Sequence, residues 1–134
     1  MRAGRELRRA VCTHLIREVT LIEGRAFDRA VRENVYPYVT LGPSYWTDDS
    51  AECIRGRTIT LQVDVWCSGG PAAGKANAED VVDDVATALD GWADTEVLTM
   101  HPARVTMVRV MDDPKGAVHG VVQIEVDVEN QGLS

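Results

Sequence analysis

The residues of this chain that most resemble a reaction site form a glycine-rich turn near the middle of the sequence. Residues Gly69 to Lys75 read GGPAAGK and match the spacing G-x-x-x-x-G-K of a phosphate-binding loop. In such a loop the backbone N–H groups surround a phosphate and the lysine neutralises its charge. The next position is Ala76, so the hydroxyl that would hold Mg²⁺ is missing. A degenerate phosphate- or nucleotide-binding loop is therefore an alternative hypothesis, and a simple break between a strand and a helix is the plainer one.

The histidines and cysteines form no pattern that predicts a metal site or a nucleophile. They are His14, His101, His119, Cys12, Cys53 and Cys67. Cys12 and His14 are two residues apart on the expected first helix, where their side chains point to different faces. Zinc sites need closely spaced pairs of ligands that converge, and none is present. An odd number of scattered cysteines indicates free thiols in a reducing compartment and not a disulfide framework. We therefore expect no catalytic residue, no cofactor and no metal, and we do not expect an enzyme.

The glycine-rich turn joins the two strongest secondary-structure signals in the chain. Residues 58–67 carry apolar side chains at every second position, which predicts a strand with one buried face. Residues 72–92 carry apolar side chains at helical spacing and most of their acidic side chains off that stripe. The stripe consists of Ala78, Val81, Val82, Val85, Leu89 and Trp92. Packing this helix on the apolar face of the strand buries both surfaces.

The remaining segments complete an α+β order. Helices are expected at residues 4–22 and 72–92, and strands at 36–42, 58–67, 103–111 and 118–128. The polar residues 43–55 are expected to form a long hairpin loop. This order, α-β-β-α-(β)-β-β, predicts a mainly antiparallel sheet of four or five strands flanked by two helices.

Some local features of the chain stay open or need a special geometry. Residues 25–35 fit either a short extended piece or a helical turn, and residues 94–100 fit a short strand or a loop. The alternation of the strand at 103–111 slips between Met107 and Val108, which predicts a β-bulge. A length of 134 residues predicts one domain, 1–134, with residues 130–134 frayed.

Charge is distributed unevenly along the chain. The formal net charge is −7, of which residues 1–35, with eight arginines and five acids, contribute +3, and the other residues contribute −10. A domain this acidic is a poor candidate for nucleic-acid binding, which depends on neutralising phosphates. No apolar run approaches the ~20 residues needed to cross a bilayer, and the first residues have no apolar core of a signal peptide. We expect neither direct recognition of nucleic-acid sequence nor membrane contact.

Several strings, taken in order, resemble the tail-completion or tail-terminator family of long-tailed phages, prophages and gene transfer agents. The strings are YPYVTLG at 36–42, the strand 58–66 that ends in Trp before Ser-Gly, the Gly-Lys turn that leads into an Ala/Val-rich helix, Asp112-Asp113-Pro114, and His119-Gly120-Val121. The resemblance extends over residues ~7–130 when the elements are read by periodicity. It is carried by the set in order and not by one diagnostic motif.

The resemblance implies a small α/β protein without catalysis that forms a hexameric ring. Such a ring lies at the head-proximal end of the tail tube in the virion, ends tube polymerisation and offers a surface to the neck. Implied partners are other copies of the chain, the tail tube protein and a neck or head-completion protein. The resemblance also implies that assembly takes place in the host cytoplasm. A small-ligand-binding or toxin–antitoxin-like accessory protein stays open as a further alternative, beside the degenerate phosphate binder.

Charge and loop length suggest which residues would make these contacts. A head-to-tail ring brings different faces of neighbouring copies together, so an arginine-bearing side and an acidic side are the expected partners. The subunit-interface candidates are Arg5, Arg9 and Arg17 on one side and Asp80, Asp83 and Asp84 on the other. The tube or neck candidates, in the expected loop, are Tyr45, Trp46, Asp48 and Asp49. The plainer alternatives are solvated helix faces and aromatic packing on the sheet.

Overall fold

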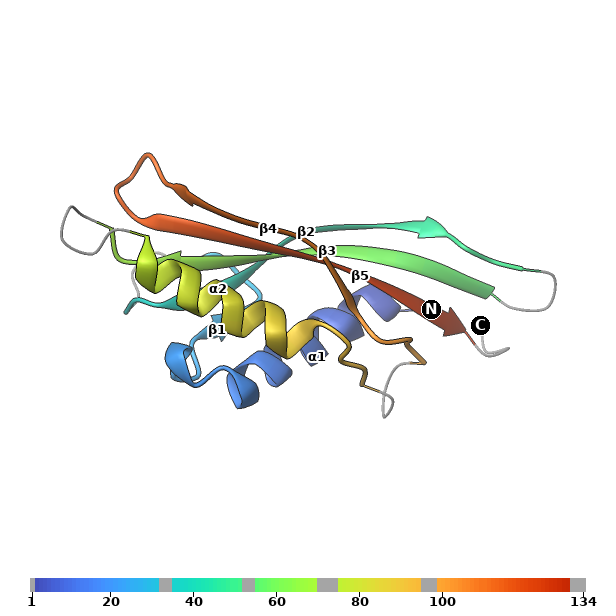
Figure 1. Ribbon diagram of the computed structural model, residues 1–134. Helices are drawn as coiled ribbons and strands as arrows, with labels where there is room; N and C mark the ends of the chain where they lie inside the picture. The colour runs from blue at the N-terminus through green and yellow to red at the C-terminus, as the bar shows by residue number, and fades with distance from the viewer. Residues whose placement is uncertain (1, 32–34, 52–54, 70–74, 95–98, 131–134) are drawn as a thin grey trace.

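Five strands form one sheet, and both helices lie on the same face of it (Figure 1). The structure is a computed structural model that describes residues 2–31, 35–51, 55–69, 75–94 and 99–130. The elements are α1 (Ala3–Glu18), the 3-10 helix η1 (Thr20–Ile22), β1 (Ala26–Phe27), β2 (Tyr38–Asp48), β3 (Arg55–Cys67), α2 (Ala76–Leu89), β4 (Arg104–Asp112) and β5 (Val118–Asn130). We call the sheet surface under the helices the helix face and the other surface the open face.

The sheet is mixed but mainly antiparallel, as the sequence predicts. Its strand order is β1-β2-β3-β5-β4, and only the short β1 pairs in parallel, with Val39 and Thr40 of β2. The extended piece that was one of two options for residues 25–35 is this β1. The α+β prediction of four or five strands with two helices is confirmed.

The core forms where the apolar side of β3 meets both helices. Ile59, Leu61, Val63, Val65 and Cys67 are all buried on the helix face. The predicted stripe of α2 is buried from Ala78 to Leu89, and Trp92, beyond the end of the helix, is half-buried against the same core. The apolar side of β3 therefore packs on the apolar stripe of α2 as expected, because this contact removes both surfaces from water.

The first helix is shorter than predicted. It ends at Glu18, because Val19 takes an extended backbone conformation with φ −101° and ψ 94°, and a 3-10 turn carries the chain on to Ile22. Leu7, Val11 and Leu15 are fully buried under the sheet, and Val19 and Ile22 continue the same apolar stripe. The stripe is thus correct, although one regular helix does not carry all of it.

The prediction of a loop at residues 43–55 is wrong for its first half. Strand β2 continues to Asp48, which pairs with Arg57 of β3, and the register shifts between Leu41 and Ser44. Pro43 lies in this irregular stretch, where β1 no longer pairs with β2, so its missing N–H leaves no partner unsatisfied. Proline among polar residues is typical of a loop in sequence. Here it lies in the part of β2 that no longer pairs with β1 and therefore forms an edge of the sheet.

Three further details of the sequence prediction can be compared with the structure. The β-bulge in β4 is confirmed, one residue or two earlier than predicted, because the register shifts between Val105 and Met107. Met100 forms an isolated bridge with Val128, whereas residues 95–98 lie outside the described part. The second helix begins at Ala76, and the predicted start at residue 72 also lies outside that part.

Candidate interaction surfaces

Contacts within the fold explain why Gly69 and Lys75, the described residues of the glycine-rich turn, are a glycine and a lysine. Lys75 Nζ lies 3.1 Å from Asp112 Oδ2, so an ion pair joins the start of α2 to the end of β4. A Cβ atom added to Gly69 would collide with the carbonyl oxygen of Gly116 in the β4–β5 turn. Residues 70–74 lie outside the described part. Strand β3 pairs antiparallel on both sides, unlike the parallel strands that crossover helices of phosphate-loop proteins connect. The local geometry favours a strand-to-helix connection.

Lys75→Ala is expected to leave the behaviour toward nucleotides unchanged. Its ammonium group already pairs with Asp112 on an exposed surface, so its loss should lower the free energy of unfolding by no more than about 1 kcal/mol. Calorimetric titration of the wild-type protein with ATP and with GTP should give no saturable heat. Saturable binding that disappears in Lys75→Ala would instead support the phosphate-binding hypothesis.

Each histidine has a separate partner. His14 is buried, its Nε2 lies 2.7 Å from the carbonyl oxygen of Ala88, and its ring stacks on Trp92 at 4.5 Å. His101 Nε2 lies 2.9 Å from Glu129 Oε1 on the exposed surface. Within the described ranges, no group of three His, Cys, Asp or Glu side chains is placed to hold a metal ion. His14 therefore joins α1 to α2, a role that its sequence neighbours do not indicate.

Of the cysteines that the structure describes, Cys12 is half-buried and Cys67 is buried, and both are free thiols. Burial raises the pKa of Cys12 to about 11, with a further increase from the nearby Asp28, and burial alone raises the pKa of Cys67 to about 11. Both therefore remain protonated at neutral pH, and a protonated thiol is a poor nucleophile. Cys53 lies outside the described residues.

A polar and aromatic network covers the open face where β3 ends and where β2 and β5 begin. Asp64 is only 7% exposed, and its Oδ1 accepts a hydrogen bond from Gln62 Nε2 at 2.8 Å and lies 2.7 Å from His119 Nε2. Trp66 stacks on His119 at 4.1 Å and donates from Nε1 to Thr40 Oγ1 at 2.9 Å. The alternation in sequence places these side chains on the outward face but gives no sign that they pair across three strands. The network makes this face rigid.

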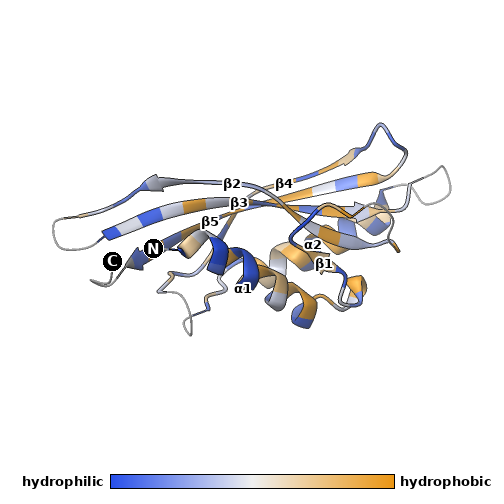
Figure 2. Ribbon diagram, turned by 180° about the vertical axis from the view of Figure 1, so that it is seen from behind, coloured by the Kyte–Doolittle hydropathy of each residue, from blue (hydrophilic) through white to orange (hydrophobic). Residues whose placement is uncertain are grey.

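The arginine candidates occupy two places on α1. Arg5 and Arg9 are exposed one turn apart, and neither side chain has a hydrogen bond or ion pair within the part of the chain that the structure describes. Ile16, 45% exposed, lies on the same stripe. Arg17 differs, because its guanidinium lies 3.4 Å from both Glu18 Oε1 and His14 Nδ1. Figure 2 shows that the start of α1 is strongly hydrophilic.

The acidic candidates form an exposed face of α2. Asp80, Asp83 and Asp84 have no hydrogen bond or ion pair from their side chains within the described ranges. Asp84 lines a shallow groove between the helices together with His14 and Glu18, the two residues that Arg17 contacts. Arg17 therefore lies beside the acidic face of its own subunit and not on an opposite side, contrary to the expected division. Arg5 and Arg9 remain separate from it.

The tube or neck candidates lie on a strand and its end, and they face in different directions. Tyr45 pairs with Thr60 and is on the open face, whereas Trp46 pairs with Ile59 and is on the helix face. Both rings extend beyond the core, with Tyr45 63% and Trp46 52% exposed. The predicted single loop surface is therefore two surfaces at the tip of the β2–β3 hairpin.

The carboxylate of Asp48 holds the end of β2. Its Oδ1 accepts hydrogen bonds from Ser50 N at 3.1 Å and from Ser50 Oγ at 2.7 Å. These two bonds lower the pKa of Asp48 below its ordinary value. Asp49, next to it, is exposed, and its backbone N–H bonds to the carbonyl oxygen of Gly56. The two carboxylates thus present negative charge beside Tyr45 and Trp46.

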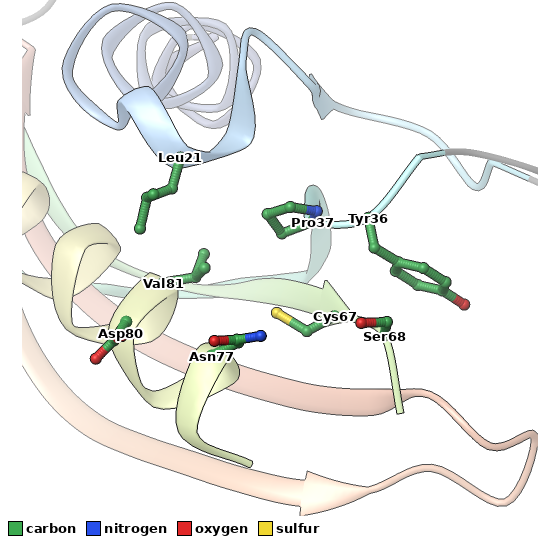
Figure 3. A pocket seen from close by; sticks show the side chains of 8 residues that line it. All are labelled: Leu21, Tyr36, Pro37, Cys67, Ser68, Asn77, Asp80 and Val81. Carbon is green, nitrogen blue, oxygen red and sulfur yellow. The ribbon is translucent and has the colours of Figure 1, made fainter. Parts of the chain in front are cut away.

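An open pocket lies at the other end of the sheet, between η1 and α2 (Figure 3). We call it the η1–α2 pocket; its volume is about 290 Å³. It is lined by Leu21, Tyr36, Pro37, Cys67, Ser68, Asn77, Asp80 and Val81. Leu21 and Tyr36 are more than two-fifths exposed, so the pocket is open to solvent on their side.

Comparisons with known proteins give one family and one fold. The family model described as "Tail completion protein gp17" matches residues 9–129. A chain in a solved structure of the "Virion of native gene transfer agent (GTA) particle" is similar, with a TM-score of 0.79 and 21% sequence identity over 92% of this chain and 95% of that chain. At this identity the likeness shows the fold. A search among curated proteins gives no match. In the described ranges, neither helix is long and apolar enough to cross a membrane.

Proposed function

The chain belongs to the tail completion protein gp17 family, a family of structural virion proteins, and from that premise we propose that it caps the head-proximal end of the tail tube. The cap ends polymerisation of the tube and forms the joint to the head or neck. The observation that carries this proposal is the family match, which spans the larger part of α1, all of α2 and nearly the whole sheet. The fold of the gene transfer agent virion chain supports it.

The cap acts through its outer surfaces, with copies of the chain placed side by side in a hexameric ring. Different surfaces of neighbouring copies meet in a head-to-tail contact, which closes into a ring when the rotation permits. Arg5 and Arg9 on one copy and Asp83 and Asp84 on the next are the complementary charges, since none has a partner within the described part of its own chain. Arg17 and Asp80 belong to the same set of contacts.

The hairpin tip supplies the contact to the tube or neck. Tyr45 lies on the open face, and Asp48, which pairs with Arg57, lies on the helix face. Both are near the end of β2, at the end of the sheet opposite to η1 and the start of α2 (Figure 1), and Asp49 follows directly. An exposed tyrosine combines a large apolar area with a hydroxyl, which is typical of interface anchors. Trp46 points to the opposite face of the same strand and therefore needs a different partner.

Labelling the assembled particle tests the location of the cap. A short peptide tag inserted at Lys115, in the exposed β4–β5 turn, is expected to leave the core intact. Gold-labelled antibody against the tag should appear in electron micrographs of separated tails as one cluster at the head-proximal end. Label along the whole tube, or at the distal tip, would contradict the proposal.

A further inference from the structure

The hairpin tip carries an exposed aromatic side chain that a neighbouring arginine holds in one conformation. Trp46 is 52% exposed on the helix face, and the guanidinium carbon of Arg57 lies 3.8 Å from the centroid of its ring. This cation–π contact holds both side chains in place before any partner arrives, so less conformational entropy is lost on binding. Tryptophan and arginine are the residues that most often dominate interface energies.

The η1–α2 pocket has the complementary chemistry. Leu21, Pro37 and Val81 supply apolar walls, and Asp80 lies at the edge with its carboxylate directed outward from the cavity (Figure 3). Asp80 has no side-chain partner within the described ranges. The volume of about 290 Å³ is roughly ten times the ~30 Å³ that one water molecule occupies in the liquid. The pocket therefore has room for a large side chain such as that of Trp46, and the Asp80 carboxylate can pair with the guanidinium of Arg57.

The tip of the β2–β3 hairpin and the start of α2 lie at opposite ends of the sheet (Figure 1), so the aromatic group and the pocket cannot meet within one chain. Arg57 lies near the start of β3, and Cys67, which lines the pocket, lies at its end. The ten residue steps from Arg57 to Cys67 span roughly 33 Å at the rise of a strand. A contact between these two surfaces must therefore join two molecules, and it joins different surfaces of each.

We propose that Trp46 of one copy fills the η1–α2 pocket of the next copy in the ring, where Arg57 pairs with Asp80. This inference rests on the proposed ring and names one of its contacts. A second copy is the occupant because the tryptophan with its cation and the pocket with its carboxylate occur once in every copy. Each copy of a closed ring can thus satisfy both. The contact is heterologous, the type that generates rings.

A photoreactive residue at position 46 tests the contact in assembled tails. Trp46 is replaced by p-benzoylphenylalanine, which keeps an aromatic ring and inserts into C–H bonds nearby after irradiation. The expected result is a covalent dimer of this chain in which mass spectrometry finds position 46 joined to the segment of Pro37 or of Val81. The same residue at position 45, on the opposite face of the strand, serves as the control and should not reach the pocket.

Charge exchange adds a second readout. Arg57→Glu alone and Asp80→Arg alone should each reduce the dimer yield several-fold, and the two together should restore it. Crosslinks confined to the tube or neck protein, or no crosslink to the pocket segments, would overturn the inference even when the protein occupies the tube end. Absence of the protein from the head-proximal end would instead overturn the proposed function, so the two failures are distinguishable.

Discussion

Gly120→Val is expected to lower the free energy of unfolding by about 1–3 kcal/mol, the usual range for overpacking a core. Gly120 lies in β5 where α2 crosses the sheet, and an added Cβ would collide with Val82 Cγ2 and lie 3.3 Å from Val65 Cβ. Valine is β-branched and has few rotamers, so Val82 cannot turn away easily. Urea denaturation with linear extrapolation measures the change.

A matched glycine in an open position separates this effect from general glycine effects. A Cβ at Gly4, in α1, would have no atom within 4 Å, so Gly4→Ala should be neutral or stabilise the protein by up to ~1 kcal/mol. Gly120→Ala should also lower the free energy of unfolding, since its Cβ meets the same methyl group of Val82. Adding Val82→Ala to Gly120→Ala should recover part of that stability, because the colliding methyl group is gone. Wild-type stability of Gly120→Val would contradict the packing of α2 on β5 that displays the acidic face.

The double variant Asp83→Lys/Asp84→Lys is expected to lose ring formation on the tube end. Both carboxylates are exposed on α2 without a partner in the described ranges, and reversal would place lysines opposite Arg5 and Arg9 of the neighbouring copy. Exposed charges act at short range and are screened by salt, so the wild-type ring should also weaken as ionic strength rises. The amount of this protein bound to purified tail tubes, measured by co-sedimentation at several salt concentrations, reports both effects.

A control with the same change of charge shows whether position matters. Glu23→Lys/Asp112→Lys alters two exposed carboxylates away from the acidic face of α2. It breaks their exposed ion pairs with Arg25 and Lys75, each of which contributes no more than about 1 kcal/mol, so binding should stay near the wild-type level. Arg5→Glu/Arg9→Glu should fail in the same way as the aspartate variant, and combining the two sets should restore binding. Unchanged ring formation and salt dependence in Asp83→Lys/Asp84→Lys would show that this pairing is wrong.

The sequence predicts the elements whose burial pattern is regular. Strand β3 and helix α2 have one apolar side each, and the periodicity of two and of 3.6 residues identifies both and the way they pack. The turn at Asp113 is also predictable, since Pro and Gly mark it and Gly116 has a φ of +95°. These features can be predicted because they depend on residues that are neighbours in sequence.

The parts that sequence reasoning misses depend on pairing between strands and not on local propensity. Strand β2 extends past Pro43 because its second half also pairs with β3, although its polar residues are typical of a loop. Asp64 meets His119 from a separation of 55 residues, and nothing around either residue indicates it. The split of Tyr45 and Trp46 between two faces follows only once residues 44–48 are known to be a strand. The candidate contact surface therefore changes more than the fold does.

Tail length in particles made without this protein tests the central claim most directly. Electron micrographs of particles from a producer that lacks the gene, compared with one that supplies it from a plasmid, give the length distribution and the fraction of tails joined to heads. If the chain caps the tube, its loss should produce tails of widely varying and excessive length without heads, and the plasmid should restore both. Tails of normal length attached to capsids in its absence would contradict the account.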